Sequence, residues 1–129
     1  MQHDTLSDAL STIKNARRAG KKECVVSPAS DLIKNVLKVM QKEGYVGLFE
    51  HIDDGKGGKF RVEIKKNLND CNAIKPRFNV KKDDYNSWEK RYLPAAGFGT
   101  LVVTTSQGVM THTKAIEEGL GGSLLAYMY

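Results

Sequence analysis

The chain has 129 residues, and its 20 lysines and arginines exceed its 15 acidic residues to give a formal net charge of +5. This length indicates one domain or two small lobes, and a hydrophobic fraction of 40% is enough for a modest core. No apolar stretch approaches the length of a membrane span, and the polar start 1–4 is unlike a secretory signal. We therefore expect a cytoplasmic protein without a membrane partner, and its basic surplus suits a polyanion such as nucleic acid.

The cysteines and histidines do not indicate a metal site. Cys24 and Cys71 are separated by 47 positions and belong to no C-x-x-C motif, while His3, His51 and His112 are scattered. Such spacing predicts neither a zinc site nor a disulfide framework. We expect reduced, buried thiols, no metal and no cofactor.

The first predicted element is an amphipathic helix that begins at Asp4 or Thr5 and ends at Gly20. Its apolar residues recur at steps of three and four: Leu6, Ala9, Leu10, Ile13 and Ala16. Basic residues gather around its last turn: Lys14, Arg17, Arg18, Lys21 and Lys22. Cations at this end complement the helix dipole. Five of them exceed what a dipole requires, so a phosphate-facing patch is the second interpretation.

A short strand is predicted over Glu23–Val26, followed by a second helix. Ser27 and Pro28 are predicted to be its N-cap and first residue, and Gly44 its end. Its buried stripe consists of Ile33, Val36, Leu37 and Met40. Ser30, Lys34 and Lys38 lie near its amino end or outer face, where unpaired backbone N–H groups favour a phosphate.

The next two strands are predicted over Tyr45–Asp53 and Lys59–Lys66, as a hairpin around the loop 54–58. Apolar and charged residues alternate along the second strand, which predicts one packed and one wet face. The glycines of the loop lack the order and the following helix of a nucleotide-binding loop, so no nucleotide site is expected.

A polar joint at 67–73 is predicted to precede an extended segment over Ile74–Val80. Asp83 or Asp84 then caps a helix that Pro94 stops. Tyr85, Trp88 and Tyr92 share one face of this helix. Such an aromatic stripe is more typical of core or lobe packing than of base stacking.

The most distinctive stretch is T-T-S-Q-G-V-M-T over Thr104–Thr111, directly after the apolar strand Leu101–Val103. Three consecutive hydroxyl side chains cannot all be buried without partners, so at least one faces outward. Gly108 allows positive φ or a close approach to a ligand. Thr111 is predicted to open a short helix that ends at Gly119. A Ser/Thr-rich turn that only caps this helix is the alternative that these residues leave open.

The sequence leaves two other functions to be weighed. Ser106, His112 and Glu117 can imitate a hydrolase triad, but the G-x-S-x-G motif is absent and His112 is expected to be exposed or capping at the start of a helix. The protein is therefore not expected to be an enzyme. The other alternative is a DNA-binding regulator that uses the basic first helix, which a preference for structured RNA over duplex DNA at matched salt would exclude.

Two C-terminal segments carry a family resemblance. The stretch Thr104–Thr111 and the end L-G-G-S-L-L-A-Y over Leu120–Tyr127 closely resemble the C-terminal signature of the family of ribosomal protein eight of the small subunit. Ile13–Ala16 and Ile74–Phe78 are weaker matches, and the resemblance covers essentially the whole chain. The segment Tyr85–Pro94 resembles the archaeal or eukaryotic branch rather than the bacterial one.

The resemblance implies a ribosomal, cytoplasmic protein that is a primary binder of small-subunit rRNA. It implies contact with a helical element of the central domain, support for subunit assembly and translation, and neighbouring ribosomal proteins as partners. Binding to its own messenger RNA is left open. The implied core contacts are Thr104, Thr105, Ser106, Gln107 and Gly108, and the secondary contacts are Lys14, Asn15, Ser30 and Lys34. Hydroxyl and amide groups suit the shallow RNA minor groove, and lysines supply salt-dependent affinity.

Two positions depart from the family pattern. Ser123 stands where bacterial relatives carry glutamate, so a contact that needs that carboxylate is absent. Asp31 stands where the family often carries a basic residue, which weakens the case for a phosphate at that helix end. The fold expected overall is α/β (α+β) with two lobes. Residues 1–66 form an α-β-α-β-β lobe, and 74–129 form a mainly β lobe with short helices and the hydroxyl-rich loop.

Overall fold

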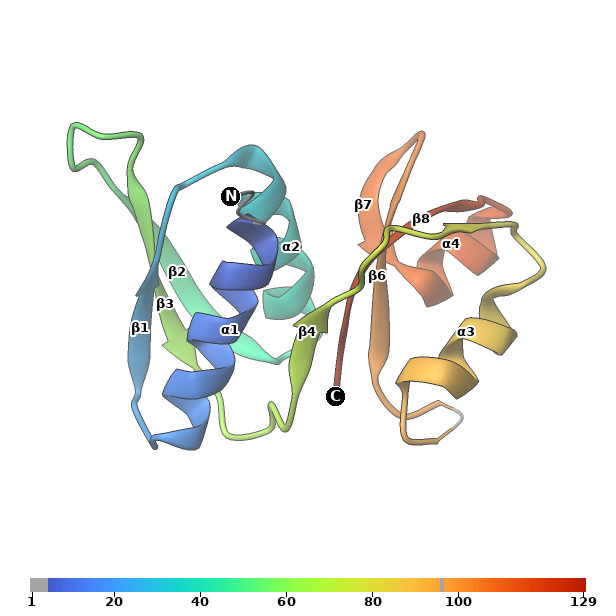
Figure 1. The fold of residues 1–129 in the computed structure, drawn as a ribbon, viewed down its shortest axis with the longest axis horizontal. Helices are drawn as coiled ribbons and strands as arrows, with labels where there is room; N and C mark the ends of the chain where they lie inside the picture. The colour runs from blue at the N-terminus through green and yellow to red at the C-terminus, as the bar shows by residue number, and fades with distance from the viewer. Residues whose placement is uncertain (1–4, 96) are drawn as a thin grey trace. The chain divides into compact units, whose positions relative to one another are not determined.

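The computed structural model describes residues 5–95 and 97–129, which form four helices and two antiparallel sheets (Figure 1). The mixed helix and sheet class predicted from the sequence is therefore confirmed, as an α+β fold. The chain divides into two compact units, Met1–Cys71 and Asn72–Tyr129. Each unit is described by itself.

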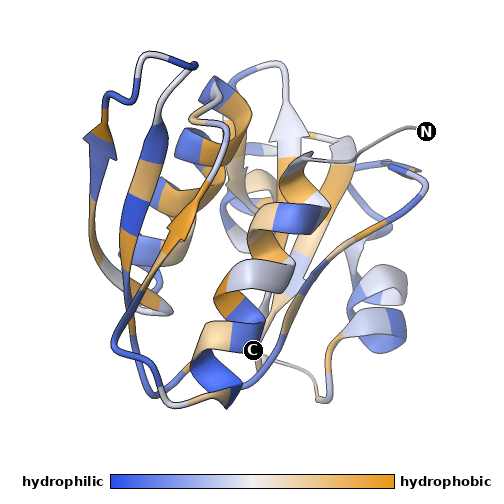
Figure 2. Ribbon diagram, turned by 60° about the vertical axis from the view of Figure 1, so that its left-hand side comes forward, coloured by the Kyte–Doolittle hydropathy of each residue, from blue (hydrophilic) through white to orange (hydrophobic). Residues whose placement is uncertain are grey.

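The first unit has the predicted order α-β-α-β-β. Its elements are α1 (Thr5–Arg18), β1 (Glu23–Val26), α2 (Asp31–Lys42), β2 (Val46–Ile52) and β3 (Lys59–Ile64). The strands form one antiparallel sheet in the order β1-β3-β2, with both helices on one face (Figure 1). The core combines the apolar stripes of the helices with alternate residues of β3: Leu6, Leu10, Ile13, Ile33, Leu37, Met40, Phe60 and Val62. Figure 2 shows the alternation of polar and apolar residues along β3.

The predicted start of the second helix is wrong by three residues. Ser30, not Ser27, is the N-cap, and its Oγ accepts a hydrogen bond from the backbone N–H of Ile33 at 3.2 Å. The segment before it is held by the hairpin loop, because the N–H of Ala29 donates to the carbonyl of Gly58 at 3.1 Å. At the start of α1, the proposed cap Asp4 lies outside the described residues.

The second unit contains β4 (Cys71–Ala73, which begins at the unit boundary), β5 (Asn79–Val80), α3 (Tyr85–Tyr92), β6 (Thr100–Thr105), β7 (Gly108–Thr111), α4 (His112–Glu118) and β8 (Gly122–Met128). Its sheet has the order β4-β8-β6-β7, and β5 also pairs with β8. One face of the sheet packs on the two helices around a core of Ile74, Val80, Tyr85, Leu93, Leu101, Val103, Met110, Ala115 and Leu124.

The hydroxyl stretch forms a β-hairpin that the sequence did not predict. Gly108–Thr111 is a strand rather than part of a turn, and it pairs with β6 in the register Thr104↔Val109 and Thr105↔Gly108. The helix that follows is confirmed. Thr111 is its N-cap, and Gly119 ends it with φ 68°.

His112 is buried, contrary to the exposed or capping role expected of it. Its Nδ1 accepts a hydrogen bond from the N–H of Leu101 at 3.1 Å, and its Nε2 pairs with a carboxylate oxygen of Glu89. An Nδ1 acceptor leaves the ring hydrogen on Nε2, facing the carboxylate. The ring therefore joins α3, β6 and α4, and Thr111 does the capping instead.

Candidate nucleic-acid interface

The tip of the β6–β7 hairpin is a two-residue turn, Ser106–Gln107, that the hydroxyl of Thr105 closes. Thr105 Oγ1 accepts a hydrogen bond from the N–H of Gln107 and donates one to the carbonyl of Gly108, both at 3.0 Å. Gly108 has φ 107°, so the positive φ expected there is confirmed. The Thr105 hydroxyl therefore shapes the turn, and it uses its single hydrogen to do so.

The side chains of Ser106 and Gln107 point their polar groups at solvent. Both residues are exposed, and the structure gives their side chains no hydrogen bond to residues 5–95 or 97–129. A hydroxyl and an amide in this setting offer donors and acceptors to an external partner without breaking an internal bond. They carry no charge, so they do not repel phosphate.

A row of polar side chains crosses the sheet beside this tip. Thr104 on β6 pairs with Ser123 on β8, and Ser123 pairs with Asn79 on β5. Directly paired residues share a face of the sheet. Ser123 Oγ donates to Asn79 Oδ1 at 2.7 Å, which leaves the Asn79 amide hydrogens pointing outward from an exposed residue. Sequence reasoning missed Asn79, whose signal was a polar residue between the apolar Phe78 and Val80.

Glycines let β8 approach the hydroxyl strand closely. A Cβ on Gly122 would lie 2.4 Å from the carbonyl oxygen of Thr104 and 3.1 Å from Cγ2 of Thr105. A Cβ on Gly121 would lie 2.7 Å from the carbonyl oxygen of Val80. The glycine pair next to the hydroxyl stretch is therefore a packing requirement of the sheet that supports the hairpin.

The four secondary residues lie in the first unit and differ in how far their polar groups are already engaged. Lys14 Nζ forms an ion pair with Asp70 at 3.1 Å, in a half-buried position. Ser30 caps α2 through its Oγ. Asn15 and Lys34 are exposed.

The basic residues at the end of α1 also differ in whether their charged groups are already engaged. Arg17 is half-buried, and its guanidinium donates to the carbonyl of Lys66 at 2.9 Å. Arg18, Lys21 and Lys22 are exposed and face solvent. The exposed members of the cluster, rather than all five residues, are available to a phosphate.

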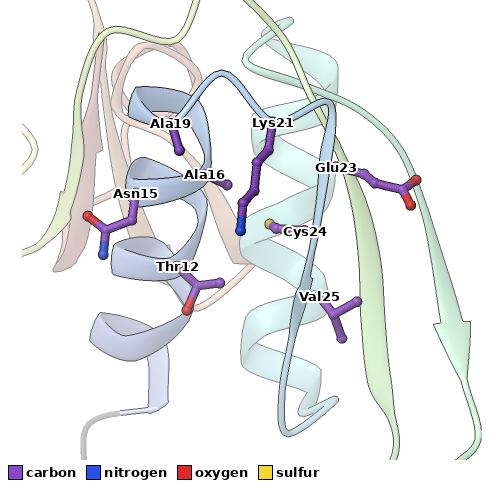
Figure 3. Close-up of a pocket in the computed structure, with 8 residues that line it drawn as sticks. All are labelled: Thr12, Asn15, Ala16, Ala19, Lys21, Glu23, Cys24 and Val25. Atoms are coloured by element: carbon purple, nitrogen blue, oxygen red, sulfur yellow. The ribbon is translucent and has the colours of Figure 1, made fainter.

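A groove of about 500 Å³ runs between α1 and β1 beside these residues (Figure 3). Asn15 and Lys21 line it together with the half-buried Cys24, which was expected to be buried. Burial raises the pKa of the Cys24 thiol to about 11 and that of the buried Cys71 thiol to about 12. The two cysteines are not joined in a disulfide, and at neutral pH both thiols stay protonated.

The arrangement does not support the hydrolase triad. Ser106 lies at the exposed hairpin tip, whereas His112 is buried and its second nitrogen pairs with Glu89 instead of Glu117. Within 5–95 and 97–129 there is no group of three or more side chains suited to a metal ion. In the same residues no helix is long and apolar enough to cross a membrane.

Comparison with known protein families gives a match over nearly the whole chain. The family model described as Ribosomal protein S8 matches residues 4–129, a span that includes both units and the hydroxyl hairpin.

Proposed function

This chain belongs to the ribosomal protein S8 family and is a small-subunit ribosomal protein that binds rRNA; from this premise we propose that it binds a helical element in the central domain of that rRNA and supports assembly of the subunit. The family is structural rather than enzymatic and locates the protein in the ribosome. An RNA helix of the same shape in its own messenger would meet the same protein groups.

The observation that carries the proposal is the hairpin tip. Ser106 and Gln107 present exposed polar groups on a turn that Thr105 holds in shape. In our proposal these two side chains bond to ribose hydroxyls and base edges in the shallow groove of an RNA helix. Thr104 joins them from the polar row, and Gly108 allows the RNA backbone to approach, since a Cβ there would meet no protein atom within 4 Å.

The four residues of the first unit take different parts in this proposal. Asn15 and Lys34 are exposed and make direct contacts. Lys14 and Ser30 contribute through groups that are already paired with Asp70 and with the α2 backbone, so they also position the backbone around them.

The test compares a neutral and a charged variant. Replacing Ser106 and Gln107 together by alanine should weaken binding to a central-domain rRNA helix about 5- to 150-fold, because each lost interfacial hydrogen bond costs about 0.5–1.5 kcal/mol. The dependence of affinity on salt should not change, because no charge is removed. Lys34→Gln should instead flatten that dependence by about 0.9 in log–log slope, or somewhat less on RNA.

Two controls complete the design. Chemical protection of whole small-subunit rRNA tests whether the footprint lies in the central domain. Duplex DNA at matched salt tests the DNA-binding alternative. Wild-type affinity of a folded double-alanine variant, or an equal affinity for duplex DNA, would contradict the proposal.

A further inference from the structure

The second unit carries a row of aromatic rings that the hairpin site does not use. Adjacent ring centroids are 4.7 to 6.4 Å apart along the series Phe78, Trp88, Tyr92, Tyr127, Tyr129 and Phe98. The first five are half-buried and pack on the core, and Phe98 is 51% exposed. The sequence predicted a packing role for the aromatic residues on one face of α3. Of these three, Tyr85 is fully buried, whereas Trp88 and Tyr92 are only half-buried.

Arg91 lies across one end of the row. Its guanidinium carbon is 5.2 Å from the Phe78 ring centroid, 5.3 Å from that of Trp88 and 5.6 Å from that of Tyr92. Contacts of this kind hold a guanidinium in place by cation–π attraction. Arg91 remains exposed. The three rings therefore orient the plane of its guanidinium, and the other side of that plane faces solvent.

A hollow of about 280 Å³ lies beside this plane, on one face of α3. It is lined by Asp84, Ser87, Trp88 and Arg91, which are spaced as i, i+3, i+4 and i+7 along the helix. Asp84 occupies the N-cap position, but its side chain makes no capping hydrogen bond. The sequence predicted a cap from Asp83 or Asp84, and the structure instead leaves the Asp84 carboxylate available to accept hydrogen bonds from a ligand.

We propose that this hollow holds an unpaired base of the rRNA next to the helix that the hairpin binds. The base stacks on the solvent side of the Arg91 guanidinium, which itself lies over the Trp88 indole, as unstacked RNA bases do on arginine planes. Asp84 accepts hydrogen bonds from the edge of the base. Guanine fits best, because its Watson–Crick edge presents two adjacent N–H donors to one carboxylate.

Charge favours RNA over an apolar protein segment as the occupant. The stacking surface is a guanidinium rather than a methyl-rich patch. Exposed basic residues lie close in sequence to the residues that form it: Arg77, Lys81, Lys82 and Lys90. They would neutralise the phosphates on either side of a bound base. The proposal rests on the proposed function for the nature of its partner but uses none of the hairpin residues.

The experiment uses Trp88, the only tryptophan of the chain, as its probe. The full-length protein is titrated with a blunt central-domain helix and with the same helix extended by a single-stranded tail of guanines or of uridines. The guanine tail should quench Trp88 fluorescence and raise affinity about 5-fold or more, the scale of one stacked base. The uridine tail should give a smaller gain.

Charge-conserving variants separate stacking from electrostatics. Arg91→Lys keeps the charge and removes the plane, so it should abolish most of the gain from the tail. The matched control Lys90→Arg, on the neighbouring exposed position, should retain the gain. Asp84→Asn should reduce the preference for guanine over uridine. Folding of each variant is checked by circular dichroism.

Failure of this proposal is distinguishable from failure of the hairpin site. Equal affinity for tailed and blunt RNA, or a wild-type tail effect in Arg91→Lys, would overturn the base-binding proposal while helix binding persisted. Trp88 fluorescence that responds only to other small-subunit proteins would also overturn it and assign the surface to a protein. If the hairpin proposal were wrong, the Ser106 and Gln107 variants would instead bind the blunt helix with wild-type affinity.

Discussion

The β2–β3 and β6–β7 hairpins close their turns with different chemistry. In the β2–β3 loop, Asp54 Oδ1 accepts hydrogen bonds from the N–H groups of Lys56 and Gly58, at 2.8 and 2.9 Å, and Asp53 accepts one from Gly55. In the β6–β7 hairpin, the hydroxyl of Thr105 closes the turn by hydrogen bonds to the N–H of Gln107 and the carbonyl of Gly108. The stretch from Thr104 to Thr111 contains no charged residue.

In our proposal, this difference in turn chemistry decides which hairpin binds RNA. Both turns are polar and have glycine within or next to them, so composition alone does not distinguish them. A turn closed by carboxylates places negative charge where phosphates would have to approach. A turn closed by a hydroxyl stays neutral.

The largest expected effect breaks the support of the neutral hairpin. Gly122→Ala places a Cβ against Thr104, and the sheet must open to accept it, which should lower the free energy of unfolding by about 3 kcal/mol. Gly55→Ala in the other hairpin meets no atom within 4 Å and strains only φ, at about 1 kcal/mol. Urea denaturation of the two variants measures the contrast. Equal stabilities would contradict it.

The next prediction gives the neutral tip a charge. Gln107→Glu should weaken binding to a central-domain helix about 10-fold or more, because a carboxylate then faces the RNA phosphates. The folded protein should be as stable as wild type, since Gln107 is exposed. Asp54→Asn, which removes a charge from the other hairpin, should leave RNA affinity unchanged. Binding isotherms for both variants at one salt concentration decide the matter.

A smaller effect isolates the closing hydroxyl. Thr105→Val retains the shape of the side chain and loses its two turn hydrogen bonds, so stability should fall by about 1 kcal/mol and the Gln107 amide should exchange faster with solvent. Thr104→Val, on the opposite face of the same strand, should leave both quantities unchanged. Unaltered exchange at Gln107 in Thr105→Val would show that the turn holds without the hydroxyl.

The smallest effect is a difference in pH response. Hydrogen bonds from the N–H groups of Lys56 and Gly58 hold the pKa of Asp54 below its ordinary value. A carboxyl with a lowered pKa in the folded state stabilises above its unfolded pKa, and this contribution is lost as pH falls through the lowered value. The protection of the Gly58 amide against exchange, relative to its intrinsic rate at each pH, should therefore fall in acid, while that of Gln107 should not. Asp54→Asn should remove the response at Gly58.

The sequence predicted those parts of the fold that local patterns determine. The bounds of β1 and the caps of α4 agree with the structure, because alternation, a threonine N-cap and a C-terminal glycine act over a few residues. The start of α2 was predicted wrongly at Ser27, since Ser27 and Ser30 are both good cap residues and the sequence does not reveal that the backbone of Ala29 bonds to Gly58. β7 is too short to be recognised without its pairing partner.

The candidate site also combines features that local sequence predicts with features that depend on distant residues. The sequence shows the three hydroxyl side chains of Thr104–Ser106, but it does not show which of them makes the hydrogen bonds that close the turn. The polar row through Asn79 depends on the register of three strands, and the pairing of Lys14 depends on Asp70, which lies beyond the whole first sheet in the chain. The burial of His112 depends on Glu89, 23 positions away. Local patterns carry no information about such distant partners.

The β2–β3 loop has a practical use. A Cβ added at Gly55 or Gly57 would meet no other atom within 4 Å, and Figure 1 shows the loop extending beyond its sheet. Lengthening such a loop costs only about 0.6 kcal/mol for each doubling. A peptide tag or fluorophore acceptor inserted between Gly55 and Lys56 should therefore be tolerated, and it would report on incorporation of the protein into particles without occupying the hydroxyl hairpin.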